Sequence, residues 1–221
     1  MIPKPHDNPL LRGGLGEFDL SSLETKATYK RTLHTERRQI RDLRKIKTAA
    51  EAIDGLDHEN EIFGFTKGQF SLLDLLHAIL RLTGPAHLSI STWTAAAYEL
   101  ESISALVQRG DVTGTRWLID FSMARRESAM TARMREMFGW HNIRVAQVHA
   151  KFALFQNADW KIALRSSMNL NMNPRCEDFQ VAHDPEIAGF LNGILDEIFT
   201  SQTKELADAR PYDIVKATNA D

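Results

Sequence analysis

The stretch His149-Ala-Lys-Phe-Ala-Leu-Phe155, followed by Lys161-Ile-Ala-Leu-Arg-Ser-Ser-Met-Asn169, carries the clearest signal in this 221-residue chain. A polar, turn-like segment at 156–160 separates the two apolar runs, so the pattern predicts two consecutive β-strands. Side chains alternate between the two faces of a strand, and His149 and Lys151 are therefore expected on one face. An imidazole and an ammonium group would then project side by side, within reach of one phosphate group.

Five polar groups follow one another within 29 residues: His149, Lys151, Ser167, Asn169 and Glu177. Cleavage of a phosphodiester needs a nucleophile, donors or cations for the phosphoryl oxygens and a proton for the leaving oxygen. An imidazole serves as the nucleophile, and the ammonium, hydroxyl and carboxamide groups serve the oxygens. A His-x-Lys pair alone is common by chance, so the weight of this pattern comes from the Ser-Ser-Met-Asn run and the later Glu177.

This arrangement resembles the phospholipase D superfamily, whose signature is His-x-Lys, four residues, Asp, about six residues, Gly-Ser-x-Asn or Gly-Gly-x-Asn, and a Glu shortly afterwards. The resemblance covers about residues 143–181. It departs from the signature at two positions, because Gln156 stands at the Asp and Ser166 at the Gly, and the hairpin between the two strands is about two residues longer. The Asp is generally taken as structural in this superfamily, so its replacement leaves the proposed chemistry in place.

The resemblance implies a metal-independent phosphodiesterase with His149 as the nucleophile and a phosphohistidine intermediate. Lys151, Asn169 and Ser167 would bind the phosphoryl oxygens, and Glu177 would accept a hydrogen bond from the far ring nitrogen of His149. One imidazole cannot be both the nucleophile and the leaving-group acid, and the chain has one copy of the motif. The resemblance therefore implies a homodimer with a shared active site, and no cofactor or metal.

Alternating strand and helix patterns continue upstream of the motif. Strands are expected at 61–65, 88–93, 116–121, 143–155, 161–165 and 179–182, and helices at 71–82, 95–108, 124–138 and 185–206. Short connections between alternating elements predict an α/β fold, with a mixed sheet flanked by helices on both faces. The order suits a phospholipase D-like half-domain at 56–221, preceded by an arm and a basic helix at 1–55, with helical spacing over 24–54.

Composition indicates an ordinary globular chain, with 43% hydrophobic and 25% charged residues. Cys176 is the single cysteine, so an intramolecular disulfide is excluded and a reducing, cytoplasmic location is expected. The first residues lack an apolar signal region, and no run is long and apolar enough for stable membrane insertion.

Positive charge gathers near the N-terminus. Nine basic and two acidic residues lie between Lys26 and Lys47, a local charge of +7 in a chain of net charge −2. This segregation indicates either contact with a polyanion or a solvated face that forms ion pairs with the acidic remainder. The residues expected to contact nucleic acid are Arg37, Arg38, Arg41, Arg44, Lys45, Arg125 and Arg126.

Other functions remain open. A nuclease is favoured over a phospholipid phosphodiesterase because of these cations, and a non-catalytic nucleic-acid-binding protein with a degenerate motif is the alternative from another class. Two other kinds of site have weak support, since neither has a diagnostic spacing. These are a zinc site from His141, His149, Cys176 and His183, and a triad from Ser167, His183 and Asp184.

Overall fold

A computed structural model describes residues 37–40, 46–126, 128–172 and 174–201. The elements in chain order are β1 (Arg38–Ile40), α1 (Ala49–Ala52), β2 (Glu61–Thr66), α2 (Leu72–Thr83), β3 (Ala86–Thr92), α3 (Ala97–Arg109), β4 (Val112–Asp120), α4 (Phe121–Arg126), α5 (Ser128–Phe138), the 3-10 helix η5 (Trp140–Asn142), β5 (Ile143–Ala146), β6 (Phe152–Gln156), β7 (Lys161–Ser166), β8 (Glu177–His183) and α6 (Pro185–Ser201).

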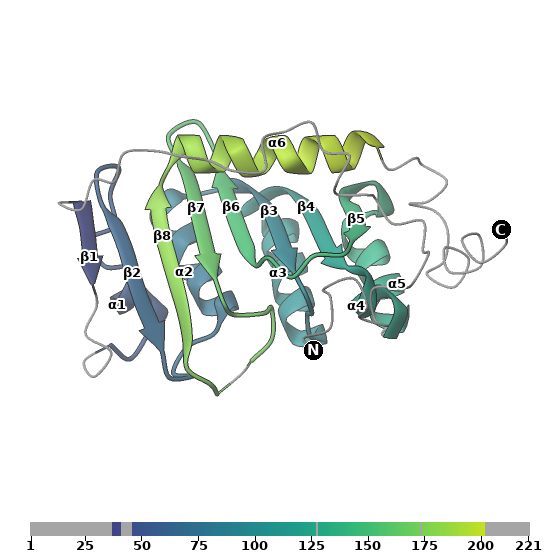
Figure 1. The fold of residues 1–221 in the computed structure, drawn as a ribbon, viewed down its shortest axis with the longest axis horizontal. Helices are drawn as coiled ribbons and strands as arrows, with labels where there is room; N and C mark the ends of the chain where they lie inside the picture. Colours follow the sequence, from purple (N-terminus) through teal and green to yellow (C-terminus); the bar gives the residue numbers. More distant parts are fainter. Residues whose placement is uncertain (1–36, 41–45, 127, 173, 202–221) are drawn as a thin grey trace, which may run out of the picture.

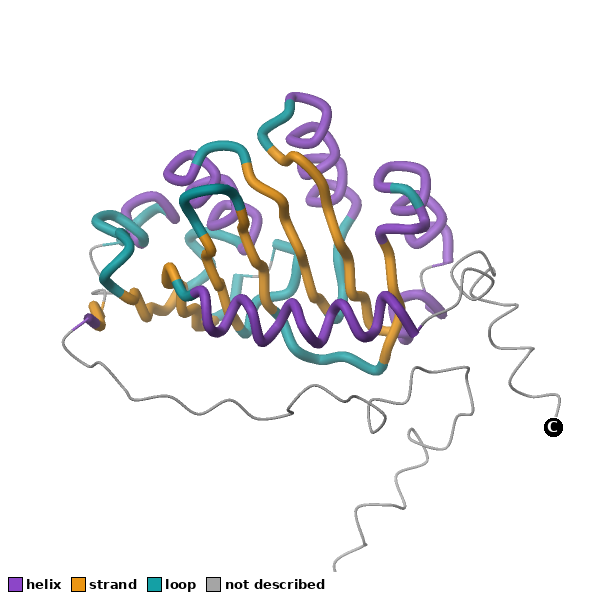
Figure 2. The backbone as a smooth tube through the Cα atoms, turned by 90° about the horizontal axis from the view of Figure 1, so that it is seen from above, coloured by secondary structure: helices purple, strands orange, loops and turns teal. Residues whose placement is uncertain are grey.

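The described strands form one eight-stranded sheet in the order β1-β2-β8-β7-β6-β3-β4-β5 (Figure 1). β3, β4 and β5 are parallel to one another, whereas β2, β8, β7, β6 and β3 pair successively in antiparallel fashion. α2, α3 and α5 lie on one face of the sheet, and α6 runs across the opposite face (Figure 2). The predicted α/β fold with a mixed sheet between helices is confirmed.

Each face of the sheet has its own apolar core. The larger core lies under the helices α1, α2, α3 and α5, and it includes the fully buried Trp117, Phe155 and Phe179. The smaller core joins α6 to the central strands through residues such as Leu154 and Leu195. Burial on both faces explains why β6 is a nearly continuous apolar run, a pattern that periodicity alone does not separate from a buried helix.

Local signals position α2 as predicted. The hydroxyl of Ser71 accepts a hydrogen bond from the amide of Asp74, and the Asp74 carboxylate accepts one from the amide of Ser71, which completes a capping box. The helix stops at Gly84, which has a φ of 72°. A positive φ is strained for residues with a side chain, so this glycine ends the helix where the sequence predicted.

The helix predicted over 24–54 is wrong in its described part. Arg38–Ile40 forms the edge strand β1, parallel to β2, and only Ala49–Ala52 is helical. Residues 24–36 and 41–45 lie outside the described part of the chain. The error has a physical cause, because helical spacing records only the local pattern, whereas β1 is held by main-chain pairing with a strand more than 20 residues later.

The strand predicted over 143–155 is interrupted at 147–151. β5 pairs only with β4 among the described strands, while β6 lies beyond β3, between β3 and β7. The chain must therefore cross the ends of β4 and β3 before it can enter β6. The predicted helix over 124–138 is likewise found as two helices, α4 and α5, with residue 127 between them outside the description.

Candidate active site

The crossing segment 147–151 carries His149 and Lys151, and two buried side chains hold it. Asp120, at the carboxyl end of β4 and 5% exposed, accepts a hydrogen bond from the amide of Val148 at 3.0 Å. Ser91, near the end of β3, donates its hydroxyl proton to the carbonyl of Ala150 at 2.8 Å. The segment therefore lies at the carboxyl ends of two parallel strands, where loops of α/β proteins commonly form sites.

His149 and Lys151 are close, although not through the strand geometry that the sequence predicted. The Lys151 Nζ atom lies 3.1 Å from Nδ1 and 3.2 Å from Nε2 of His149, and 3.0 Å from its carbonyl oxygen. The in-plane lone-pair directions of the two ring nitrogens diverge, so an ammonium equidistant from both lies over the ring. This places both side chains at one point of the surface, where a single phosphate can contact them.

Burial lowers the pKa of Lys151, and the nearby carboxylates of Glu177 and then Asp120 oppose that shift. Desolvation disfavours an ammonium cation, while negative charge within a few ångströms favours it. The two carboxylates therefore help to keep this half-buried lysine charged.

A turn after β7 brings Ser167 and Glu177 beside the crossing segment. The amide of Ser166 donates to the carbonyl of Lys151 at 3.2 Å, which joins the two segments directly. The Ser167 hydroxyl donates a short hydrogen bond to Glu177 and accepts one from the amide of Asp178 at 2.9 Å. Glu177 thus accepts a hydrogen bond from Ser167, and no hydrogen bond joins it to His149 among the described residues.

Asn169 is anchored near this turn by its neighbour. The amide of Leu170 donates to Thr94 and Thr92, and its carbonyl accepts from the amide of Ala96 at 2.9 Å. The Oδ1 atom of Asn169 is buried without a hydrogen-bond partner. Within the described residues, Asn169 makes no hydrogen bond to His149 or Lys151, so the structure places it at the same end of the sheet without joining it to the pair.

A groove of about 700 Å³ opens beside these residues. His149, Lys151, Ser166 and Ser167 line one end of it, strands β6, β7 and β8 form its floor, and α6 contributes Ile187, Phe190 and Leu191 to its wall. The ring of Trp93 lies 5.6 Å from that of His149, centroid to centroid. The groove can therefore hold a group larger than a phosphate.

Both departures from the family signature have a structural explanation. Gln156 ends β6, five residues from Lys151, which corresponds to about 16 Å along a strand. A side chain there does not reach the phosphate position. Ser166 replaces the signature's glycine without a positive φ, and its hydroxyl donates to the carbonyl of Asp178 at 2.5 Å and accepts from the amide of Met168 at 3.0 Å.

The residues expected to contact nucleic acid are only partly described. Arg37 forms an ion pair with Glu59 at 3.0 Å, and Arg38 forms one with Glu61 at 2.7 Å. These two cations thus match the second reading of the basic segment, in which they pair with carboxylates of the body. Arg125 and Arg126 belong to α4, whereas Arg41, Arg44 and Lys45 lie outside the described residues.

Neither of the alternative sites is assembled. No group of three or more histidine, cysteine or acidic residues is arranged to hold a metal ion in the described ranges. Ser167 and His183 lie near opposite ends of β8, about 20 Å apart along the strand, so no triad forms. His183 instead packs against His58 at 4.5 Å between ring centroids.

Sequence reasoning missed Asp120, Ser91 and Trp93. Asp120 was visible as a carboxylate that ends the strand expected at 116–121, the position at which α/β proteins carry polar site residues. Ser91 and Trp93 were visible only as members of a buried strand. Their proximity to residues 149 and 150 depends on the neighbouring positions of β3 and β6 in the sheet.

Two solved structures illustrate the partial likeness in fold between this chain and known proteins. Polyphosphate kinase from Porphyromonas gingivalis has a TM-score of 0.48 and 14% identity, over 70% of this chain and 29% of that one. Phosphatidylserine synthase from Haemophilus influenzae Rd KW20 has a TM-score of 0.40 and 15% identity, over 72% of this chain and 44% of that one. This chain thus spans less than half of either protein.

No protein-family model matches the sequence, and no curated protein does. In the described part of the chain, every helix is too short or too polar to cross a lipid bilayer.

Proposed function

We propose that this chain is a phosphodiesterase of the phospholipase D superfamily, with His149 as its nucleophile. The observation that carries the proposal is the contact between the Lys151 ammonium and the His149 ring, beside Ser167 at one end of a groove. His149, Lys151 and Ser167 reach this end from two segments separated by the hairpin of β6 and β7. More particularly, we propose a nuclease that needs no metal ion and forms a phosphohistidine intermediate.

The chemistry follows from the groups at the groove's end. A ring nitrogen of neutral His149 attacks phosphorus, a nitrogen–phosphorus bond forms, and the phosphorus–oxygen bond to the leaving group breaks. Water then attacks the phosphohistidine and releases the phosphate product. Lys151 and Ser167 stabilise the charge on the phosphoryl oxygens, and each such donor typically lowers the barrier by about 2.7–4 kcal/mol.

The leaving oxygen also needs a proton. His149 is the only imidazole that lines the groove among the described residues, and it is occupied as the nucleophile. A second His149 from another copy of the chain supplies the acid in this proposal. The active form is therefore a homodimer in which the groove end of one protomer faces that of its partner, with each copy contributing one imidazole.

Nucleic acid is the substrate that we favour, because two cations, Lys151 and Arg165, line the groove. The chain also carries Arg125 and Arg126 on α4. Contacts of this kind hold phosphates without selecting a base sequence.

The direct test uses labelled single- and double-stranded DNA and RNA in buffer containing EDTA. Wild-type protein is expected to cleave at least one of them, and His149→Ala is expected to lose more than about a thousandfold in rate. His141→Ala is the matched control, since that exposed imidazole lies on η5 outside the groove lining. Cleavage that requires a divalent metal ion would rule out the proposed mechanism.

Subunit mixing tests the shared site. If both imidazoles serve one reaction, mixing equal amounts of wild-type and His149→Ala protein leaves about half of the original activity after subunit exchange, because mixed dimers are inactive. A protein that works as a monomer keeps all of it. Wild-type protein diluted to the same final concentration in buffer, without the variant, is the control for the effect of dilution on activity.

A phospholipid substrate is the second candidate, and the apolar part of the groove favours it. Phe63, Ile187 and Leu191 are among the residues that line the groove. The same wild-type and variant pair assayed on phospholipid vesicles distinguishes the two substrates. A protein that binds DNA with a steep salt dependence but cleaves neither substrate would instead be the non-catalytic binding protein.

A further inference from the structure

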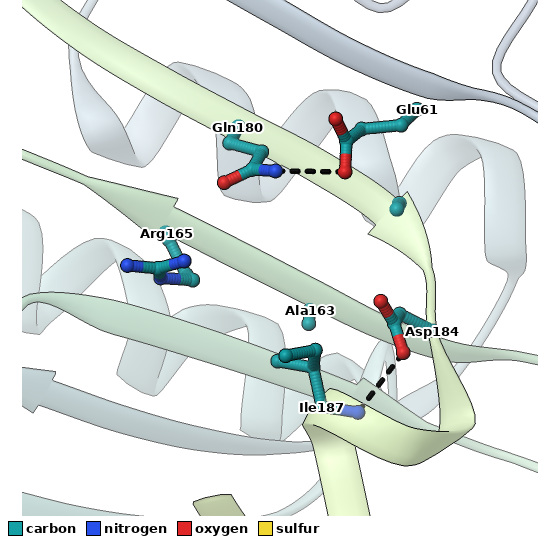
Figure 3. Close-up of a pocket in the computed structure, with 7 residues that line it drawn as sticks. Glu61, Ala163, Arg165, Gln180, Asp184 and Ile187 are labelled. Carbon is teal, nitrogen blue, oxygen red and sulfur yellow. Dashed lines mark hydrogen bonds between the residues drawn. The ribbon is translucent and has the colours of Figure 1, made fainter. Parts of the chain in front are cut away.

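Arg165 is the cation in the groove that the proposed reaction does not use. It projects from β7 and is exposed, and it lines both the large groove and the small pocket of Figure 3. Within the described residues, its guanidinium group makes no hydrogen bond or ion pair. Such a group holds five donors in a planar fork that fits a phosphate.

The carboxylates near Arg165 are occupied elsewhere. Glu61, which is 9% exposed, accepts hydrogen bonds from Arg38 and from Gln180, each at 2.7 Å. Asp184 accepts the amide of Ile187 at 2.9 Å, at the start of α6. In Figure 3 Arg165 lies apart from both acids, with no dashed line to either.

One further carboxylate, that of Asp178, lines the groove on the same side. It belongs to β8, two residues before Gln180, and Gln180 is the residue directly opposite Arg165. A diagonal cross-strand neighbour lies about 7–8 Å away, a distance that a long side chain can span, yet no hydrogen bond or ion pair joins Asp178 to Arg165 in the described part of the chain. Arg165 therefore keeps its donors for a ligand.

The position of Arg165 relative to the catalytic end follows from strand register. Arg165 pairs with Phe152 on β6, and the next residue, Ser166, donates its amide to the carbonyl of Lys151. Arg165 thus follows Lys151 along the groove, one residue step farther from His149 and toward α6. An extended polyanion that places one phosphate at His149 and Lys151 can bring a neighbouring phosphate to Arg165.

We propose that Arg165 forms a second phosphate-binding position and makes the site selective for substrates with consecutive phosphodiesters, such as a nucleic-acid strand. This inference rests on the proposed phosphodiesterase activity and narrows its substrate class. Arg165 acts as a specificity residue, because it contacts a phosphate that does not react. An isolated phosphodiester reaches His149 without it.

The test compares substrates that differ in phosphate number. For a trinucleotide with two phosphodiesters, Arg165→Gln is expected to raise KM about tenfold with kcat little changed, since a charged hydrogen-bonded contact is lost at an exposed site. For bis(4-nitrophenyl) phosphate, which has one phosphodiester, kcat/KM is expected to stay unchanged. Arg165→Lys is expected to give a trinucleotide KM between those of wild type and Arg165→Gln. Lysine keeps the positive charge but lacks the planar set of donors of the guanidinium group.

Lys161→Gln is the matched control. Lys161 is exposed on the same strand and the same face as Arg165, four residues earlier, and about 13 Å farther from the catalytic end. The Lys161→Gln substitution removes one positive charge, as Arg165→Gln does, but Lys161 does not line the groove. The KM for the trinucleotide should therefore stay at the wild-type value. An equal rise in KM for both variants would show general electrostatic attraction and overturn the proposal.

Two other results would also overturn it: an unchanged trinucleotide KM in Arg165→Gln, or an equal loss of activity on the one-phosphate substrate. A binding measurement separates this proposal from the catalytic one. In the His149→Ala background, Arg165→Gln should reduce the salt dependence of trinucleotide binding by about 0.7 in log–log slope. If wild type cleaves no substrate, the proposed function fails, and the binding slope alone decides for or against the Arg165 position.

Discussion

Replacement of Asp120 by Asn should loosen the segment that carries His149. The buried carboxylate accepts hydrogen bonds from the amide of Ser122 at 2.8 Å and, through its other oxygen, from the amide of Val148 at 3.0 Å. The hydroxyl of Ser122 also donates to it. Asn has nearly the same shape but only one acceptor oxygen. If that oxygen keeps the two donors of Ser122, the side-chain NH₂ group faces the amide of Val148.

The magnitude follows from the bond that is lost. A hydrogen bond to a charged group contributes about 1.5–3 kcal/mol, and little of this is screened because Asp120 is 5% exposed. A loss of about 2 kcal/mol lowers the melting temperature of a domain of this size by about 4–8 °C. Asp120 is a positioning residue, so kcat should also fall while KM for the substrate changes little.

Thermal unfolding followed by circular dichroism measures the change in global stability. Hydrogen exchange of the Val148 amide measures how often the segment 147–151 opens locally. Asp111→Asn is the matched control, since Asp111 precedes β4 at its opposite end and forms an exposed ion pair with Arg109. Such pairs contribute only about 0–1 kcal/mol. Unchanged protection of the Val148 amide in Asp120→Asn would refute the reasoning, whatever happens to activity.

Three further outcomes are expected. Glu177→Gln removes the charge that opposes the burial-induced lowering of the Lys151 pKa, so the alkaline limb of the activity profile should shift to lower pH in a pH–rate series. Burial first, and then Arg116, lowers the pKa of His87 below its ordinary 6.5, so the folded chain binds fewer protons than the unfolded chain. That stability is present above pH 6.5 and is lost as the pH falls below it, and His87→Gln should flatten this dependence in urea unfolding between pH 8 and 5. Ser166→Gly, which introduces the glycine of the phospholipase D signature, should lower the free energy of unfolding by about 1 kcal/mol by the same measurement, since two hydrogen bonds of the turn are lost.

Two residues that differ from the phospholipase D signature, Gln156 and Ser166, leave the geometry around His149 and Lys151 intact. The strand geometry removes Gln156 from the phosphate position, and the turn after β7 uses the hydroxyl of Ser166 in place of a flexible glycine. Neither change removes a group from the end of the groove at which His149 and Lys151 meet.

By itself, the sequence determined the alternation of strands and helices, the helix expected at 71–82 and the candidate pair of His149 and Lys151. These features depend on local periodicity and on residues a few positions apart, which a chain carries in its order alone. It did not determine the path of residues 147–151 or the pairing of β1. Those depend on partners far along the chain: Val148 with Asp120, Ala150 with Ser91, and Ile40 with Phe63.

The tertiary structure also decided which groups meet. Ser167, rather than His149, holds Glu177, because the turn after β7 and the start of β8 are adjacent in the sheet. The sequence showed Arg165 only as a member of a strand. The strand register places it beside the groove, and within the described residues Glu61 pairs with Arg38 and Gln180 rather than with Arg165. Sheet order sets such distances, and no local pattern in a single sequence encodes it.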